Sequence, residues 1–235
     1  MGALEIFRQA GIDVRPGSCI TLYGAPGLGK TCLALALAKA LGRPTVLIAT
    51  EPNMADGEFI KFAMRYAPGD VDFQDLTDRP TTGKVWYRIQ KAMERGGPVT
   101  LIVDSLSALV DAIAVAEGQT DPRVLAARTS TAVRTIAYLA RQCANRTGGT
   151  SILIAQASST AGAQPYRGRF AERPAFTRRV DHYVSHEALL AMDVDAGQRV
   201  LTCTLNRSNP WLEGRSARFR FTESDVELVE EGRRG

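Results

Sequence analysis

The sequence predicts an α/β fold with a mainly parallel, twisted sheet flanked by helices, and with antiparallel strands at its C-terminal end. Apolar runs typical of strands alternate with helical patterns up to about residue 156. Each run is continuously apolar, which indicates strands covered on both faces. After about residue 183 the pattern changes to short strand-like segments separated by turn signals, and this favours antiparallel pairing.

A glycine-rich motif, G-x-x-x-x-G-K-T, spans residues 24–31 between a predicted buried strand and a predicted Ala/Leu-rich helix. Glycines leave backbone N–H groups free to converge on phosphate oxygens, and the helix points its positive end at the anion. A lysine there reaches the β and γ phosphates, and a threonine hydroxyl ligates Mg²⁺. A chance match is the alternative, and the strand–loop–helix context argues against it. The motif predicts an ATP and Mg²⁺ site formed by Gly24, Ala25, Pro26, Gly27, Leu28, Gly29, Lys30, Thr31 and Cys32.

The remaining elements follow from periodicity and from helix and turn signals. Apolar residues at helical spacing predict a helix over 55–66, and Gly96-Gly97-Pro98 ends the next one. Pro122 suits the first turn of a long helix, which Thr147-Gly148-Gly149 closes. Predicted helices cover residues 4–10, 32–41, 55–66, 82–94, 107–116 and 122–145. Predicted strands cover residues 18–23, 45–50, 71–73, 99–103, 151–155, 186–192, 199–205, 216–221 and 225–229.

We expect one domain over residues 1–235, with residues 1–14 as an N-terminal helix and residues 157–182 as a mobile basic loop. Two domains with a break near residue 183 are the alternative. Phe7-Arg8-Gln9-Ala10 fits either an assembly segment or an ordinary amphipathic helix.

Composition narrows the class of protein. The net charge of +4 is only mildly basic, and no run of eighteen apolar residues exists, so the sequence predicts no transmembrane helix and no membrane partner. The first residues lack the pattern of a signal peptide. The four cysteines are widely spaced, which predicts reduced core residues of a cytoplasmic protein rather than metal ligands or disulfides.

Three polar residues follow apolar strand segments, at the edge where ligands bind in parallel sheets. Asp104 suits a second acid that holds Mg²⁺, or alternatively a helix N-cap. Glu51 suits a catalytic acid that orients the attacking water, or an exposed loop acid. Gln156 suits a sensor of the γ-phosphate, or a polar strand terminus.

The segment after Gln156 is long and basic. It carries arginines with interleaved aromatic residues and glycines, a composition that suits single-stranded nucleic acid through phosphate contacts and base stacking. A solvated loop without a partner is the alternative. The predicted DNA-binding residues are Arg167, Arg169, Arg173, Arg178 and Arg179, with Arg128 of the long helix as an addition.

In their order, these parts resemble the RecA/RadA recombinase ATPase core. The segment Leu101–Leu106 is similar to that family's second nucleotide motif, and Glu51 and Gln156 are similar to its catalytic glutamate and γ-phosphate-sensing glutamine. Residues 157–182 look like its second DNA-binding loop, and Arg128 is similar to an arginine of the first. The segment Asn206–Gly214, followed by Phe219–Glu223, resembles one that caps ATP on a neighbouring subunit.

Because the sequence starts almost at the core, it looks most like RadB and related archaeal recombinase paralogues. This resemblance implies an ATP-binding, DNA-binding protein that supports homologous recombination and repair, with weak, DNA-dependent ATP hydrolysis by Lys30, Glu51 and Gln156. It also implies a homo-oligomer or a complex with a main recombinase, associated with the nucleoid. Pro52-Asn53 departs from the usual glycine after the glutamate. A KaiC-like signalling ATPase, a nucleoside kinase and a non-catalytic accessory protein stay open as alternatives.

Overall fold

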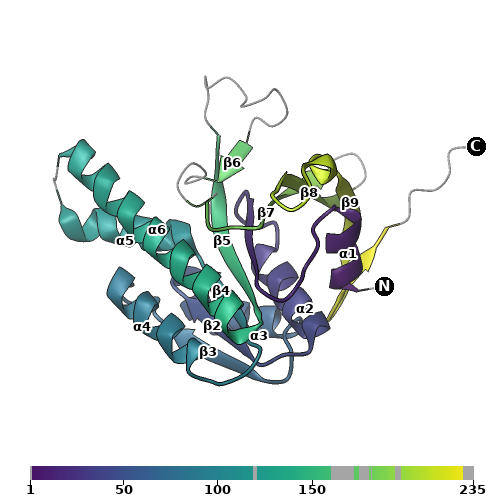
Figure 1. Cartoon of the computed structure of the whole chain (residues 1–235), viewed down its shortest axis with the longest axis horizontal. Coiled ribbons are helices and arrows are strands. Elements are labelled where there is room, and N and C mark those ends of the chain that lie inside the picture. Colours follow the sequence, from purple (N-terminus) through teal and green to yellow (C-terminus); the bar gives the residue numbers. More distant parts are fainter. Residues whose placement is uncertain are drawn as a thin grey trace, which may run out of the picture.

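The structure, a computed structural model, describes residues 2–118, 121–159, 172–174, 180, 182–193 and 197–229. Within them, ten strands form one sheet (Figure 1). The strands are β1 (Ser18–Gly24), β2 (Thr45–Ala49), β3 (Val71–Asp75), β4 (Thr100–Asp104), β5 (Thr150–Ser159), β6 (Glu172–Pro174), β7 (His186–Asp193), β8 (Gln198–Asn206), β9 (Ser216–Phe221) and β10 (Val226–Leu228). The α-helices are α1 (Ala3–Gln9), α2 (Lys30–Leu41), α3 (Gly57–Met64), α4 (Thr82–Met93), α5 (Leu106–Glu117) and α6 (Pro122–Thr147), and short 3₁₀ turns cover Pro52–Ala55 and Pro210–Leu212.

The sheet has a parallel part and an antiparallel part, which meet at β7. Its order is β10-β9-β8-β7-β1-β5-β4-β2-β3, with β6 paired to β5 outside this path. The pairs from β7 through β1 to β3 are parallel, and the pairs from β7 to β10 are antiparallel. This arrangement confirms the fold class that the sequence predicts.

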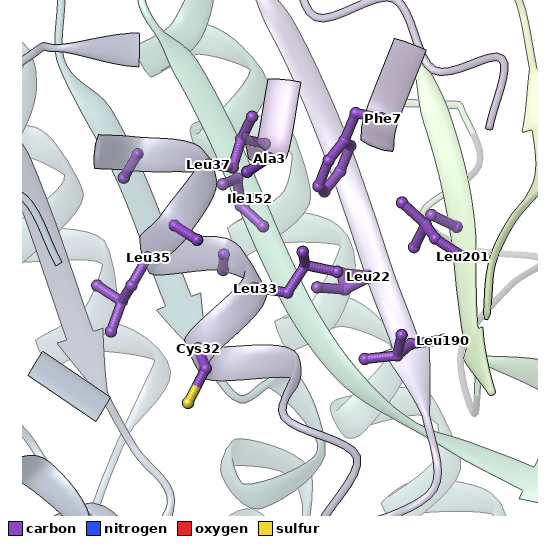
Figure 2. Packing of buried hydrophobic residues seen from close by; sticks show 14 of the residues in the cluster. Ala3, Phe7, Leu22, Cys32, Leu33, Leu35, Leu37, Ile152, Leu190 and Leu201 are labelled. Carbon is purple, nitrogen blue, oxygen red and sulfur yellow. The ribbon is translucent and has the colours of Figure 1, made fainter. Parts of the chain in front are cut away.

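Helices cover both faces of the sheet, because alternate strand residues point to opposite sides. One apolar cluster joins α1, α2 and α3 to the face that carries Leu22 and Ile152, and Figure 2 shows Leu33 of α2 beside Leu22. A second cluster joins α4, α5 and α6 to the face that carries Val103 and Leu153. Alternation along single strands, as between Ile152 and Leu153, therefore builds a three-layer core.

The N-terminal helix α1 lies over the first of these clusters. Phe7 and Ala10 have no exposed surface, and Figure 2 shows Phe7 between α1 and β1. Their burial in this chain's own core favours the amphipathic-helix interpretation of Phe7-Arg8-Gln9-Ala10.

The boundaries of the parallel core match the predicted segments closely, with one difference of consequence. Strand β5 continues to Ser159, so Gln156 lies inside the strand and not after its end. Pairing of Ala157 with Pro174 in β6 extends β5 beyond the apolar run that predicted it.

The four cysteines lie in the core, as their spacing in the sequence predicts. Cys19, Cys32, Cys143 and Cys203 are free and buried, and within the described ranges no cluster of His, Cys, Asp or Glu suits a metal-ligand set of three or more. No helix in the described part of the chain is long and apolar enough to span a bilayer.

Candidate nucleotide site

The register of the sheet brings the predicted site residues to one edge. Gly24 at the end of β1 pairs with Gln156 of β5, and Asp104 at the end of β4 pairs with Ala49 of β2. The backbone N–H of Glu51, two residues beyond β2, donates to the Asp104 carbonyl at 3.2 Å. The carboxyl ends of four neighbouring parallel strands thus converge on the glycine-rich motif.

The motif forms a loop between β1 and α2. Gly27 and Gly29 have φ of 76° and 88°, in the left-handed region that glycine adopts without strain. Gly29 is the N-cap of α2 and no side-chain hydrogen bond from the described residues caps that end, so first-turn N–H groups are left for an anion. The loop therefore has the shape and polarity of a phosphate cradle.

Lys30 lies folded into this loop. Its Nζ donates to the carbonyls of Gly24 at 3.0 Å and Ala25 at 2.8 Å. Burial lowers the pKa of Lys30, and the nearby carboxylates of Glu51 and Asp104 oppose that shift. The backbone of the first two loop residues thus holds the ammonium beside the loop.

Asp104 and Thr31 meet beneath the loop. The Thr31 hydroxyl donates to Oδ2 of Asp104 at 2.6 Å, across a separation of 73 residues in sequence. Asp104 is fully buried, and Oδ1 has no hydrogen-bond partner among the described residues. Burial, followed by the charge of Glu51, raises the pKa of Asp104. The N-cap alternative for Asp104 is wrong, because Ser105 caps α5 by accepting from the Ala108 N–H.

Glu51 and Gln156 are in contact across the site. The Gln156 amide Nε2 donates to Oε1 of Glu51 at 3.3 Å, and both residues are half-buried. The Gln156 backbone N–H donates to the Ser107 hydroxyl at 2.9 Å, which ties β5 to α5. Glu51 is thus directed into the site rather than exposed on a loop.

The donor set fits a nucleotide with a divalent cation. The buried carboxylate of Asp104 lies close to the half-buried carboxylate of Glu51, and one Asp104 oxygen has no hydrogen-bond partner in the described part of the chain. A hard cation favours such oxygen ligands, and its charge reverses the cost of burying them. The Thr31 hydroxyl, already on Asp104, supplies a further oxygen.

The predicted DNA-binding arginines are placed only in part. Arg128 is exposed on α6 and lines an open cavity of about 650 Å³ with residues of α4 and α5. The backbone of Arg173 lies in β6, where it pairs with Ser158. The side chain of Arg173 and the residues Arg167, Arg169, Arg178 and Arg179 lie outside what the structure describes.

Two further residues lie at the loop, and the sequence analysis assigns neither of them to the loop of its own chain. Arg199 of β8 donates from Nε to the Leu28 carbonyl at 3.0 Å, and its guanidinium lies 4.8 Å from the ring centroid of Phe221. A Cβ on Gly29 would come within 2.7 Å of that ring. Alternation in the last strands marks Phe221 as an inward residue, but no local pattern pairs either residue with a loop far away in sequence.

Comparison with known proteins places the fold. The structure is similar to the crystal structure of the RadB recombinase, with a TM-score of 0.62 and 19% identity over 95% of this chain and 96% of that chain. It is also similar to a second solved structure, described as an ATPase domain, with a TM-score of 0.63 and 13% identity over 97% of this chain and 90% of that chain. No curated protein matches the sequence. These likenesses confirm the expected RecA-like fold.

A family model also matches the chain. The model describes the ATPase family associated with various cellular activities (AAA), and it covers residues 20–159, from β1 through the end of β5. That span holds the phosphate cradle and the acids gathered beside it. The chain belongs to this ATPase family and has a RecA-like P-loop fold.

Proposed function

We propose that the protein, as one ATPase domain, binds ATP with Mg²⁺ in the loop from Gly24 to Cys32 and hydrolyses it. The contact between Thr31 and Asp104 carries this proposal, because it places a hydroxyl and a buried carboxylate with an unpartnered oxygen, among the described residues, directly under the cradle. Thr31 and Asp104 would hold the cation, which neutralises phosphate charge when bound.

Each remaining residue has a role that its geometry supports. Lys30 stabilises charge on the β and γ phosphates, since its ammonium already lies at the mouth of the loop. Glu51 orients the attacking water and accepts its proton. Gln156 senses the γ-phosphate, because its amide bonds to Glu51 and its strand leads out of the site.

The test measures binding of a fluorescent ATP analogue and Mg²⁺-dependent phosphate release. Lys30→Ala removes the ammonium, so we expect the dissociation constant to rise by about 100-fold or more. Lys39→Ala is the matched control on the same helix, because Lys39 is exposed and donates to the Ser224 carbonyl instead. Unchanged affinity in Lys30→Ala would refute the site assignment.

The same strand supports a proposal of DNA binding. Ala157, one residue after Gln156, pairs with Pro174, so residues 172–174 of the basic segment lie beside the strand that carries Gln156. Single-stranded DNA would be bound through phosphate contacts from Arg128, Arg167, Arg169, Arg173, Arg178 and Arg179. We propose that the protein supports recombination and repair at the nucleoid, as a homo-oligomer or beside a main recombinase.

Anisotropy of a labelled single-stranded oligonucleotide tests this part, with and without a slowly hydrolysed ATP analogue. We expect the analogue to strengthen binding, and Gln156→Ala to abolish the difference while ATP affinity stays within about threefold. Absence of DNA binding in both states would contradict the proposal and favour a signalling ATPase or an ATP-switched accessory protein.

A further inference from the structure

The C-terminal antiparallel strands contact the phosphate loop directly. Arg199, the second residue of β8, is half-buried and donates from Nε to the carbonyl of Leu28 at 3.0 Å. These two residues are 171 positions apart in the sequence. The loop is therefore held from outside by a part of the sheet that contributes none of the acids of the proposed site.

This contact fixes the direction of one peptide group. The peptide between Leu28 and Gly29 is trans, as are the other described peptides apart from the one between Asp104 and Ser105. In a trans peptide the C=O and the N–H point in opposite directions. With the Leu28 carbonyl held toward β8, the Gly29 N–H points away from β8. Backbone N–H groups of this motif are the ones that cradle phosphate oxygens.

Aromatic packing fixes the arginine in turn. The Arg199 guanidinium lies 4.8 Å from the centroid of the Phe221 ring, and that ring packs against Gly29. Tyr66 meets Phe221 edge-on at 5.4 Å between centroids, and its hydroxyl donates to the Thr222 carbonyl at 2.6 Å. The contact with Leu28 thus comes from a side chain held by stacking and not from a freely moving one.

We propose that Arg199 is a positioning residue of the nucleotide site: it sets the Leu28–Gly29 peptide so that the Gly29 N–H faces the phosphates, and Phe221 holds Arg199 in place for this purpose. The inference rests on the proposed ATP site. It makes the β8–β9 hairpin a support of the phosphate loop, so that nucleotide affinity depends on strands beyond residue 159.

Two substitutions separate the hydrogen bond from the charge. Arg199→Gln keeps an N–H donor at the same position along the side chain but removes the charge, whereas Arg199→Met has similar length and no donor. If the peptide contact matters, Arg199→Met raises the dissociation constant for ATP by about tenfold, and Arg199→Gln keeps most of the wild-type affinity. The cradle binds ground and transition states alike, so KM rises while kcat stays within about twofold.

Arg220→Met is the matched control, because Arg220 lies on β9 and is exposed with Glu227 as its partner. It leaves ATP affinity unchanged, and thermal melting of each variant shows whether the fold is intact. Equal weakening in Arg199→Gln and Arg199→Met would overturn the inference and assign the effect to charge alone. Wild-type affinity in Arg199→Met, or a loss that only tracks the melting temperature, would also overturn it.

These results are distinguishable from a failure of the proposed ATP site. If the wild-type protein and Lys30→Ala bind ATP equally, the site assignment itself is wrong. If Lys30→Ala loses binding while Arg199→Met keeps it, the site stands and only the role of Arg199 falls.

Discussion

Gln156 and Glu51, which are 105 positions apart in the sequence, share a hydrogen bond of 3.3 Å between amide and carboxylate. The glutamine stands on the strand that leads into the basic segment, and the glutamate stands beside the phosphate cradle. The amide of Gln156 satisfies one carboxylate oxygen of Glu51. Each residue therefore restrains the other, and substitution of either one is expected to affect ATP turnover rather than ATP binding.

Glu51→Gln tests the catalytic role of the glutamate. The amide keeps the size of the side chain but does not accept a proton from water, so we expect ATP hydrolysis to fall by about 100-fold or more. ATP affinity stays within about threefold, because the Glu51 carboxylate accepts from Gln156 and, among the described residues, from no residue of the loop. Phosphate release under single-turnover conditions measures the loss. Glu58→Gln is the control, since Glu58 is an exposed residue of α3 paired with Lys61. Normal turnover in Glu51→Gln would show that Glu51 has no part in the mechanism.

The basic segment gives a prediction about salt. Replacing Arg167, Arg169, Arg178 and Arg179 together by alanine is expected to weaken binding of single-stranded DNA and to flatten its dependence on salt concentration. The reason is that each phosphate contact with single-stranded DNA releases about 0.7 counterion, so the loss of four contacts lowers the slope by about three. Titrations across a salt series measure this slope. An unaltered slope would place the DNA contacts elsewhere on the molecule.

The two left-handed glycines of the loop provide a matched pair. Gly27→Ala introduces a side chain into open space, so its cost is the backbone strain of about 1 kcal/mol. Gly29→Ala adds a collision with the Phe221 ring, which would lie 2.7 Å from the new Cβ, and we expect a total of about 3 kcal/mol. Urea unfolding of both variants measures the difference in the free energy of unfolding. Equal destabilisation would mean that Phe221 moves aside at no cost.

The buried His186 predicts a loss of stability in acid. Burial lowers the pKa of His186 below its ordinary value of 6.5, and its Nδ1 has no hydrogen-bond partner within the described residues. The unfolded chain therefore binds the proton more tightly than the folded one. The stabilisation is complete above about pH 6.5 and is lost as the pH falls through the lowered pKa.

Melting temperatures between about pH 7 and about pH 5 test this prediction. We expect the melting temperature of His186→Gln to fall less than that of the wild-type protein as the pH is lowered, because the variant has no imidazole to protonate. His182→Gln is the control, since His182 is exposed and is the other histidine of the chain. Parallel pH profiles for wild-type and His186→Gln would contradict the assignment.

Much of the site is predictable because its chemistry is local in sequence. The glycine-rich motif alone indicates which class of ligand binds. Asp104 and Glu51 lie at the ends of apolar segments whose strands must end at the same edge of a parallel sheet. The apolar run of β5 likewise marks the neighbourhood of Gln156. The end of that strand is not predictable, since Ala157 and Ser158 become strand residues only by pairing with β6.

The contact of Arg199 with Leu28 could not be predicted from any local segment of the sequence. It depends on β7 pairing with the other side of β1, which brings β8 and β9 beside the phosphate loop. The sequence shows that polar and apolar residues alternate along β8, but it does not show which strands are its neighbours in the sheet. Likewise, the pattern of α1 fits several roles, and only packing assigns Phe7 to the core.

The placement of the cysteines gives each helical layer its own chemical reporter. Cys32 and Cys203 belong to the cluster under α1, α2 and α3, whereas Cys19 and Cys143 belong to the cluster under α4, α5 and α6. Burial raises the pKa of each thiol, so that of Cys19 stands at about 12 and that of Cys143 at about 11. A thiol reagent can therefore react only when a layer opens. Peptide mapping of the modified residues would measure the opening of the two faces separately. Bound nucleotide is expected to slow the modification of Cys32 and of the face that carries it.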